Sequence, residues 1–486
     1  MPLSATSTDT RCTRVSRVAD RRPTRRAERP LRVVAGVGIV GVLVLGAAQV
    51  ATGRVADRVV PRASGKSPDP IATPVVSARR APNTLSDVTR VGALQRALSS
   101  FAGRVPENGC LLVDWAGRNV ASIRADKDLI PASTTKIVTA AAALDVLGAD
   151  HTFETAAYAL GGVQGGTVGD LYLVGGGDPV VVSDAYVATE KYPTIAGTSL
   201  ARFVESIAAS GVTTVSGSIV AVDSRYDQVR FVDAWPVDFR VVESGPLGAL
   251  VFNDGAVTGM PTKPDDPAIA AAMELRQLLA ARGIVVAGEP RHEPSLPASA
   301  VKVGSVTSAP LSTIVREMLV NSDNNTAELL VKEIGFATSK SGSTMAGLEA
   351  IRKAATKWGV APPVLSDGSG LSSANRLRCS TFGTILAART DAFADSMSVA
   401  GSVGTLREAF LDSPMKNRLV GKTGTLTGVK SLVGYLPLPD SQPVVFALLM
   451  NAPGIDNQGD YRPLWKALGD ALNKAKAHPT RDELAP

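Results

Sequence analysis

Three short polar motifs stand far apart in the chain, and they constrain its fold because their side chains can act together only if they meet. The motifs are Ser133–Lys136 (Ser-Thr-Thr-Lys), Ser322–Asn324 (Ser-Asp-Asn) and Lys422–Thr425 (Lys-Thr-Gly-Thr). Taken singly, each is short enough to occur by chance and also fits an ordinary helix turn, helix cap or polar strand. Their presence together in this order is the informative observation.

The local sequence places the first motif at the start of a helix. An apolar segment over residues 134–147 predicts a helix that ends at Gly148, and Pro131 precedes it. Ser133 then lies at or near the helix N-terminus. Lys136 follows three residues later, one turn away on the same side of the helix.

The two ends of the chain predict an antiparallel sheet with helices packed on it. Near the N-terminal end, residues 88–101 have helical periodicity, and residues 110–115 and 120–124 predict a hairpin with its turn at 116–117. The C-terminal end predicts strands over residues 418–426, 430–436 and 444–450 and a helix over 461–475. The third motif therefore lies on a strand.

The middle of the chain, between residues 150 and 301, has a different texture. Strand-like and helical segments alternate there, with strand-like patterns at 169–174, 217–222 and 283–287 and helical patterns at 199–208 and 268–281. We interpret this region as an inserted domain. The predicted fold class is therefore α/β (α+β), an antiparallel sheet with helices that is interrupted by an inserted α/β domain.

The motifs supply the groups that acyl transfer to a serine requires. Ser133 becomes a nucleophile once a base takes its proton, and Lys136 can be that base if its pKa is lowered. Burial and a neighbouring cation lower the pKa of a lysine, and Lys422 can be that cation. Ser322 and Asn324, two positions apart, can point into one cleft and relay a proton to a leaving amine. These five residues are the predicted catalytic set.

The Lys-Thr-Gly-Thr strand is predicted to bind substrate. Gly424 allows close approach of a backbone, and an open strand edge pairs with an extended peptide. The hydroxyls of Thr423 and Thr425 beside an ammonium suit a carboxylate. The backbone N–H groups of Ser133 and Thr425 are the expected oxyanion donors.

Histidine chemistry and metal chemistry have little support in this sequence. The chain has three histidines, far apart and without cysteine or acidic clusters, at positions 151, 292 and 478. A serine–histidine–aspartate site or a zinc site would need more than that. We therefore expect no metal and no cofactor.

Positive charge is concentrated at the N-terminus. Residues 1–32 carry nine arginines and three acidic residues, an excess equal to the formal charge of +6 of the whole chain. The remainder is neutral, so no nucleic-acid partner is expected. The apolar segment 33–52 follows and is long enough to cross a bilayer, with the N-terminus inside. Cleavage of this segment as a signal peptide remains an alternative.

Two of the three cysteines, Cys110 and Cys379, are expected outside the membrane, because Cys12 precedes the apolar segment. An exported pair can form a disulfide. Both also stand in apolar runs where free buried cysteines are common. The sequence leaves both states open.

The three motifs resemble those of the low-molecular-mass, class C penicillin-binding proteins, which are D-alanyl-D-alanine carboxypeptidases and endopeptidases. Further landmarks of the resemblance lie at residues 173–179, 223–226, 321–328, 367–376 and 404–407, and the likeness spans about residues 86–476. The resemblance implies a penicillin-binding/β-lactamase-like fold and cleavage of D-Ala from peptidoglycan stem peptides through an acyl-serine. It also implies inhibition by β-lactams.

Residue roles carried over by motif agree with the chemical argument. Ser133 would be the nucleophile and Lys136 the base, and Thr423 and Thr425 would bind the terminal carboxylate. The interval between the first two motifs is shorter than in the family's better-known members, which carry two extra domains there, so one inserted domain is expected. A β-lactamase and a catalytically silent wall-binding protein are the alternatives.

The expected organisation follows from these observations. Residues 1–32 form a cytoplasmic tail, 33–52 a membrane anchor and 53–85 a proline-rich linker. The catalytic domain comprises residues 86–153 and 303–477, the inserted domain 154–302, and a short tail 478–486. The catalytic body is expected outside the membrane, and secretion would follow if the apolar segment is cleaved.

Overall fold

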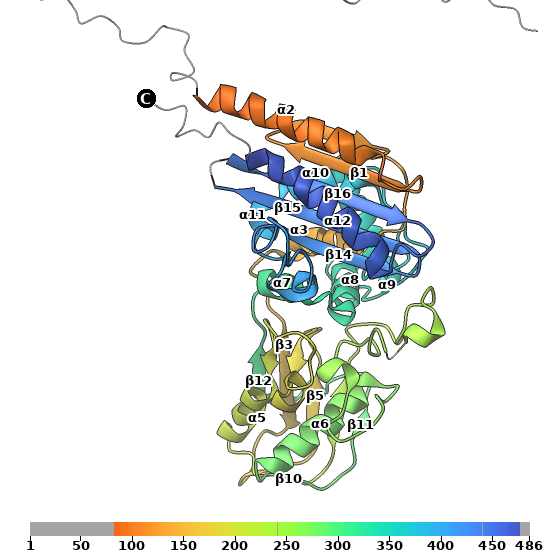
Figure 1. Cartoon of the computed structure of the whole chain (residues 1–486). Helices are drawn as coiled ribbons and strands as arrows, with labels where there is room; N and C mark the ends of the chain where they lie inside the picture. The colour runs from red at the N-terminus through yellow and green to blue at the C-terminus, as the bar shows by residue number, and fades with distance from the viewer. Residues whose placement is uncertain (1–81, 241, 440, 477–486) are drawn as a thin grey trace, which may run out of the picture. The chain divides into compact units, whose positions relative to one another are not determined.

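The structure is a computed structural model that describes residues 82–240, 242–439 and 441–476 (Figure 1). All of them belong to the unit Val75–Pro486. The expected cytoplasmic tail, the apolar segment 33–52 and linker residues 53–81 lie outside the described residues. Within the described part of the chain, no helix combines the length and the hydropathy needed to cross a bilayer.

A six-stranded antiparallel sheet combines strands from both ends of the chain (Figure 1). Its order is β13-β14-β15-β16-β1-β2. The strands are β1 (Gly109–Trp115), β2 (Arg118–Ile123), β13 (Ser398–Val399), β14 (Val420–Leu426), β15 (Val429–Leu438) and β16 (Ser441–Asn451). The predicted hairpin is present, and both turn residues, Ala116 and Gly117, have positive φ. This geometry matches the tight turns that join antiparallel strands.

Helices cover both faces of this sheet, and alternate strand residues divide between two cores. On one face lie α2 (Pro82–Ala102), α12 (Gln458–Leu472) and the short helix η5 (Asn473–Lys476). The other face is covered by α3 (Lys136–Leu147), α7 (Leu311–Asn321), α8 (Asn324–Ser339), α9 (Thr344–Lys357), α10 (Cys379–Ala388) and α11 (Thr390–Phe393). In β1, Leu111 and Val113 face the first core, whereas Cys110 and Leu112 face the second, as the two-residue period of a strand requires.

Helix α2 begins four residues before the expected domain start at residue 86. Its first residue, Pro82, is compatible with a first helical turn because proline lacks an N–H group, and an N–H group there would have no partner within the helix. The last residues of the predicted linker therefore belong to a helix.

A second set of sheets forms from the middle of the chain. A five-stranded sheet has the order β11-β9-β5-β3-β12, and a three-stranded parallel sheet has the order β10-β8-β4. The strands are β3 (Glu154–Leu160), β4 (Thr167–Val168), β5 (Leu171–Val174), β8 (Thr214–Val215), β9 (Ile219–Val222), β10 (Val285–Val286), β11 (Arg291–His292) and β12 (Ala300–Thr307), with β6 (Val181–Val182) and β7 (Thr198–Ser199) as a separate pair. Strand β12 runs across the expected domain boundary at 302/303 and pairs with β3.

Two helices of this inserted region, α5 (Leu200–Ala209) and α6 (Pro267–Ala281), share one hydrophobic core with its strands. The region also contains the short helix α4 (Asp184–Val187) and the 3₁₀ helices η2 (Val237–Phe239) and η3 (Asn253–Gly255). Helix α6 begins as its sequence suggests. Asp266 accepts hydrogen bonds from two backbone amides of the first turn, and Pro267 follows as the first helical residue.

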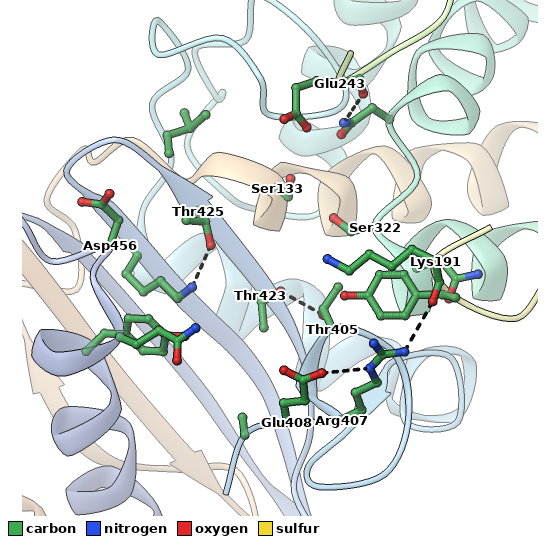
Figure 2. Close-up of a pocket in the computed structure, with 18 of the residues that line it drawn as sticks. Ser133, Lys191, Glu243, Ser322, Thr405, Arg407, Glu408, Thr423, Thr425 and Asp456 are labelled. Atoms are coloured by element: carbon green, nitrogen blue, oxygen red, sulfur yellow. Dashed lines mark hydrogen bonds and ion pairs between the residues drawn. The ribbon is translucent and has the colours of Figure 1, made fainter. Parts of the chain in front are cut away.

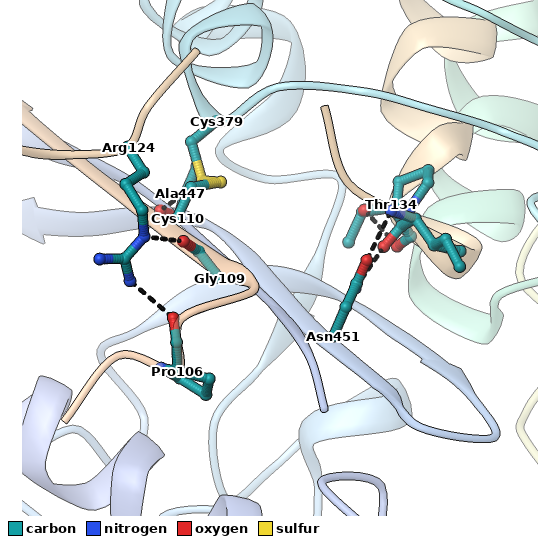
Figure 3. The surroundings of a disulfide bond; sticks show 10 residues. Pro106, Gly109, Cys110, Arg124, Thr134, Cys379, Ala447 and Asn451 are labelled. Carbon is teal, nitrogen blue, oxygen red and sulfur yellow. Dashed lines mark hydrogen bonds between the residues drawn. A yellow bond between two sulfur atoms is a disulfide. The ribbon is translucent and has the colours of Figure 1, made fainter. Parts of the chain in front are cut away.

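A disulfide joins Cys110 of β1 to Cys379 at the start of α10 (Figure 3). The structure thus selects the paired state from the two that the sequence left open. The bond connects residues separated by 269 positions, one before and one after the inserted region. It therefore links the two sequence segments from which the main sheet is built.

Candidate active site

The three motifs meet at one cavity of about 680 Å³ (Figure 2). Its lining includes Ser133 from the short 3₁₀ helix η1 (Ala132–Thr135), Ser322 and Asn324 from the α7–α8 junction, and Thr423 and Thr425 from β14. The buried lysines of the first and third motifs contact the lining serines, as described below. The structure therefore brings the residues of the three motifs together at one cavity, as their proposed chemistry requires.

Ser133 is exposed to the cavity by an unusual backbone. The predicted helix over 134–147 is split into η1 and α3, and Ala132 just before the serine has φ +49°. Left-handed φ values are costly for residues other than glycine and persist where the surrounding structure holds them. Gly424 of β14 packs against this turn, and a Cβ there would lie 2.6 Å from the carbonyl oxygen of Pro131 and 3.2 Å from the amide nitrogen of Ser133. The glycine thus lets the strand approach the nucleophile.

Lys136 is fully buried, and its amine lies beside the hydroxyl of Ser133. Its Nζ is 3.2 Å from Ser133 Oγ, and it donates to Asn324 Oδ1 at 2.6 Å and to the carbonyl oxygen of Ser369 at 2.7 Å. A neutral amine has two N–H donors and one lone pair. With both donors used by Asn324 and Ser369, the lone pair is left to face Ser133.

Burial lowers the pKa of Lys136 to about 8, against the opposing charges of carboxylates led by Asp367 and Glu328. The sequence argument had assigned part of this shift to the charge of Lys422. In the structure, burial is the cause for Lys136, and the repulsion between the two lysines acts on Lys422. About one Lys136 amine in ten can therefore be neutral, and able to act as a base, at pH 7.

Ser322 ends helix α7 in the left-handed conformation, with φ +65°. Its hydroxyl oxygen accepts a hydrogen bond of 2.8 Å from Lys422 Nζ, which also donates to the carbonyl oxygen of Thr423. Burial first, and then the charges of Lys136 and Lys430, hold the pKa of Lys422 well below its usual value. The hydroxyl proton of Ser322 is left free to be given to another group.

In the second motif, Asp323 caps a helix, whereas Asn324 contacts the base Lys136. Asp323 caps helix α8 by accepting from the amide and the hydroxyl of Thr326. Asn324 accepts from Lys136 and donates through Nδ2 to the carbonyl oxygen of Glu243 at 2.6 Å. The amide thereby ties the base to a loop of the inserted region.

The two threonines of β14 face the cavity but have different partners. Thr423 donates to the hydroxyl of Thr405 at 2.9 Å, and Thr425 accepts from Lys430 Nζ at 2.8 Å (Figure 2). Thr405 belongs to the short helix η4 (Gly404–Leu406), part of a sequence landmark whose role was not predicted. Lys430 was also missed, because a lysine on a strand gives no sign of what lies across it.

A buried carboxyl group supports the base from behind. Glu328 of α8 accepts from the backbone amides of Gly368 and Ser369, and the carbonyl oxygen of Ser369 accepts from Lys136. Burial, and then the charge of Asp367, raise the pKa of Glu328. Neither acidic residue was predicted, although both stand in landmarks of the sequence.

One rim of the cavity comes from the inserted region. Tyr192 and Lys191 line it, and the guanidinium of Arg407 lies 5.0 Å from the centre of the Tyr192 ring and contacts the backbone of Lys191 (Figure 2). Asn321 also donates to the carbonyl oxygen of Pro193. Residues of the inserted region therefore form part of the wall of the cavity that leads to Ser133.

Comparisons with known proteins identify the family. The model of the D-Ala-D-Ala carboxypeptidase 3 (S13) family matches residues 109–263 and 257–463. A D-alanyl-D-alanine carboxypeptidase of Actinomadura sp. (strain R39) is 31% identical, covering 75% of this chain and 80% of its own length. A carboxypeptidase of Mycobacterium tuberculosis is 31% identical over 74% of this chain and 77% of its own.

The fold has solved counterparts as well. Penicillin-binding protein 4 of Haemophilus influenzae superposes with a TM-score of 0.65 at 20% identity, covering 78% of this chain and 99% of that protein. The same protein has been solved in complex with a β-lactam. At this identity the likeness shows the fold, while the family match and the two sequence relatives show the family. The chain belongs to the S13 family of serine D-Ala-D-Ala carboxypeptidases.

Proposed function

We propose that the protein removes the terminal D-Ala from peptidoglycan stem peptides through an acyl-enzyme on Ser133. The observation that carries this proposal is the placement of the Lys136 amine 3.2 Å from Ser133 Oγ, with its other polar contacts satisfied by Asn324 and Ser369. This arrangement provides a base for a serine without any histidine.

The residues can be assigned to successive proton transfers. Lys136 takes the hydroxyl proton of Ser133 as its oxygen attacks the carbonyl carbon of the penultimate D-Ala. Ser322, which accepts from Lys422, gives its proton to the leaving amine of the terminal D-Ala and regains one from the proton that Lys136 took, so that Lys136 is neutral again. Water then attacks the acyl carbon and gives a proton to Lys136. The bond between the acyl carbon and Ser133 Oγ breaks, Lys136 returns the proton to Ser133, and the shortened peptide leaves as the carboxylic acid. The backbone amides of Ser133 and Thr425 would stabilise the oxyanion during both acylation and deacylation.

Substrate would align with the open edge of β14. Strand β13 pairs only with Val420 and Gly421, and in the described part of the chain no strand pairs with residues 422–426 on that edge. An extended peptide can add there as a further strand. Its terminal carboxylate would then lie beside Thr423, Thr425 and Lys422.

The same site would be acylated by β-lactams, which present a strained amide and a carboxylate. Labelling with a fluorescent penicillin, followed by mass mapping of the modified peptide, tests the assignment. We expect one adduct, on Ser133, and none in a Ser133→Ala variant that retains the native melting temperature. An adduct on another serine would refute the assignment.

We also propose the placement of the protein in the cell. An arginine-rich tail before the apolar segment 33–52 supports a single-pass anchor with the catalytic body outside the membrane. A reporter fused after residue 85 should be active outside the cytoplasm, and activity only inside would contradict the proposed orientation.

The pairing of β12 with β3 supports an inserted domain of about residues 154–307.

A further inference from the structure

A second buried lysine stands beside the third motif, and the mechanism above does not use it. Lys430 is directly opposite Thr425 in the β14–β15 pairing and is only 8% exposed. Its Nζ donates to Thr425 Oγ1 at 2.8 Å. Lys430 also lines the active-site cavity.

Aromatic rings of helix α12 hold this ammonium in place. Nζ lies 4.0 Å from the centre of the Tyr461 ring and 5.2 Å from that of Trp465. Ring faces attract cations, and the attraction strengthens where water is excluded. The lysine is therefore directed toward Thr425 rather than toward solvent.

The ammonium has no anionic partner of its own. Among the described residues no carboxylate forms an ion pair with it, and Asp456 is the acidic side chain that shares its end of the cavity. A buried cation without a counterion is unfavourable. Burial first lowers the pKa of Lys430 to about 8; the charge of Asp456 raises it and that of Arg462 lowers it. A bound anion would relieve this cost.

We propose that Lys430 is a positioning residue of the substrate carboxylate site, orienting the Thr425 hydroxyl and adding a positive charge near the carboxylate. Its N–H occupies a lone pair of Thr425 Oγ1, so the hydroxyl proton points elsewhere and is free for the substrate carboxylate. A hydroxyl that accepts from a cation is also the stronger donor. This inference rests on the proposed role of Thr425 in binding that carboxylate.

The test compares benzylpenicillin with its methyl ester, which keeps the reactive amide and lacks the negative charge. Lys430→Met retains the length of the side chain and removes the charge and the donors. Acylation of this variant by benzylpenicillin should be about tenfold slower or more, because a hydrogen bond to a charged group contributes roughly 1.5–3 kcal/mol. Acylation by the ester should be unchanged. Lys466→Met is the matched control, since Lys466 is an exposed lysine of α12 with its side chain 59% exposed.

The outcomes separate this inference from the proposal on which it rests. If Lys430→Met slows acid and ester equally, the lysine only supports packing; if it slows neither, it has no role in carboxylate binding. Either result overturns the inference. Thr425→Val should also discriminate acid from ester. If it does not, the assignment of the carboxylate to the third motif fails; if it does while Lys430→Met does not, only the role of the lysine is refuted.

Discussion

The pH dependence of acylation is a direct consequence of burying the base. An ordinary lysine has a pKa of 10.5, whereas burial brings that of Lys136 to about 8. At pH 7 about one Lys136 amine in ten would then be neutral, compared with about one in three thousand at the ordinary value. The site thus gains roughly 300-fold in active base. Because the neutral form is the base, the acylation rate should rise with pH and level off above about 8.

Single-turnover acylation by a fluorescent penicillin between pH 6 and 9 measures this directly. The rate should increase about tenfold per pH unit at the acidic end, and the melting temperature recorded over the same range controls for unfolding. Glu328→Gln keeps the oxygen that accepts from Gly368 and Ser369 and removes a negative charge that raises the pKa of Lys136. Because burial raises the pKa of Glu328 itself to about 8, this charge acts toward the alkaline end of the range, where the inflection lies. Its inflection should shift to lower pH. A rate that is flat or falls between pH 6 and 8 would refute Lys136 as the base.

Three further perturbations probe other parts of the site and fold. Replacing both Thr423 and Thr425 by valine should lower kcat/KM for D-Ala release by about two to four orders of magnitude, since each lost bond to a charged group costs roughly 1.5–3 kcal/mol; near-native rates would place the carboxylate elsewhere. Gly424→Ala puts a Cβ 2.6 Å from a backbone oxygen, so acylation should fall about 100-fold or more, with thermal melting reporting any wider damage. Replacing Cys110 and Cys379 by serine should lower the free energy of unfolding by about 3–5 kcal/mol in urea titrations, and an unchanged midpoint would contradict the pairing.

Apolar segments bounded by turn residues were enough to predict the elements that carry the motifs. The hairpin at 110–124, the strands of the third motif and the helix after Ser133 all exist. In that helix residues 136–143 are all buried, so its apolar content, not a periodic face, carried the prediction. The convergence of the motifs was predicted from chemistry, because a serine can act as a nucleophile only if its base and the other reacting groups lie close to it.

What the sequence did not reveal depends on contacts between distant segments. Lys430 occupies a position where a strand pattern predicts only alternation, and its role comes from the threonine opposite and the rings above it. The left-handed turns at Ala132 and Ser322 were missed because tertiary packing holds residues there that do not favour such angles. In the sequence, Glu328 cannot be distinguished from any other polar residue of a helix. Only the fold shows that it lies behind Lys136.

The disulfide determines how the protein responds to a proteolytic cut. The glycine-rich loop of residues 161–166, between β3 and β4, is exposed at residues 161, 164 and 165 and is a natural site for nicking. A cut there separates Ser133 from Lys422 in the primary structure, yet the Cys110–Cys379 bond keeps the two fragments covalently joined and β1 remains paired with β16. A nicked molecule should therefore still be acylated and should run as one band until a reductant releases a labelled N-terminal fragment.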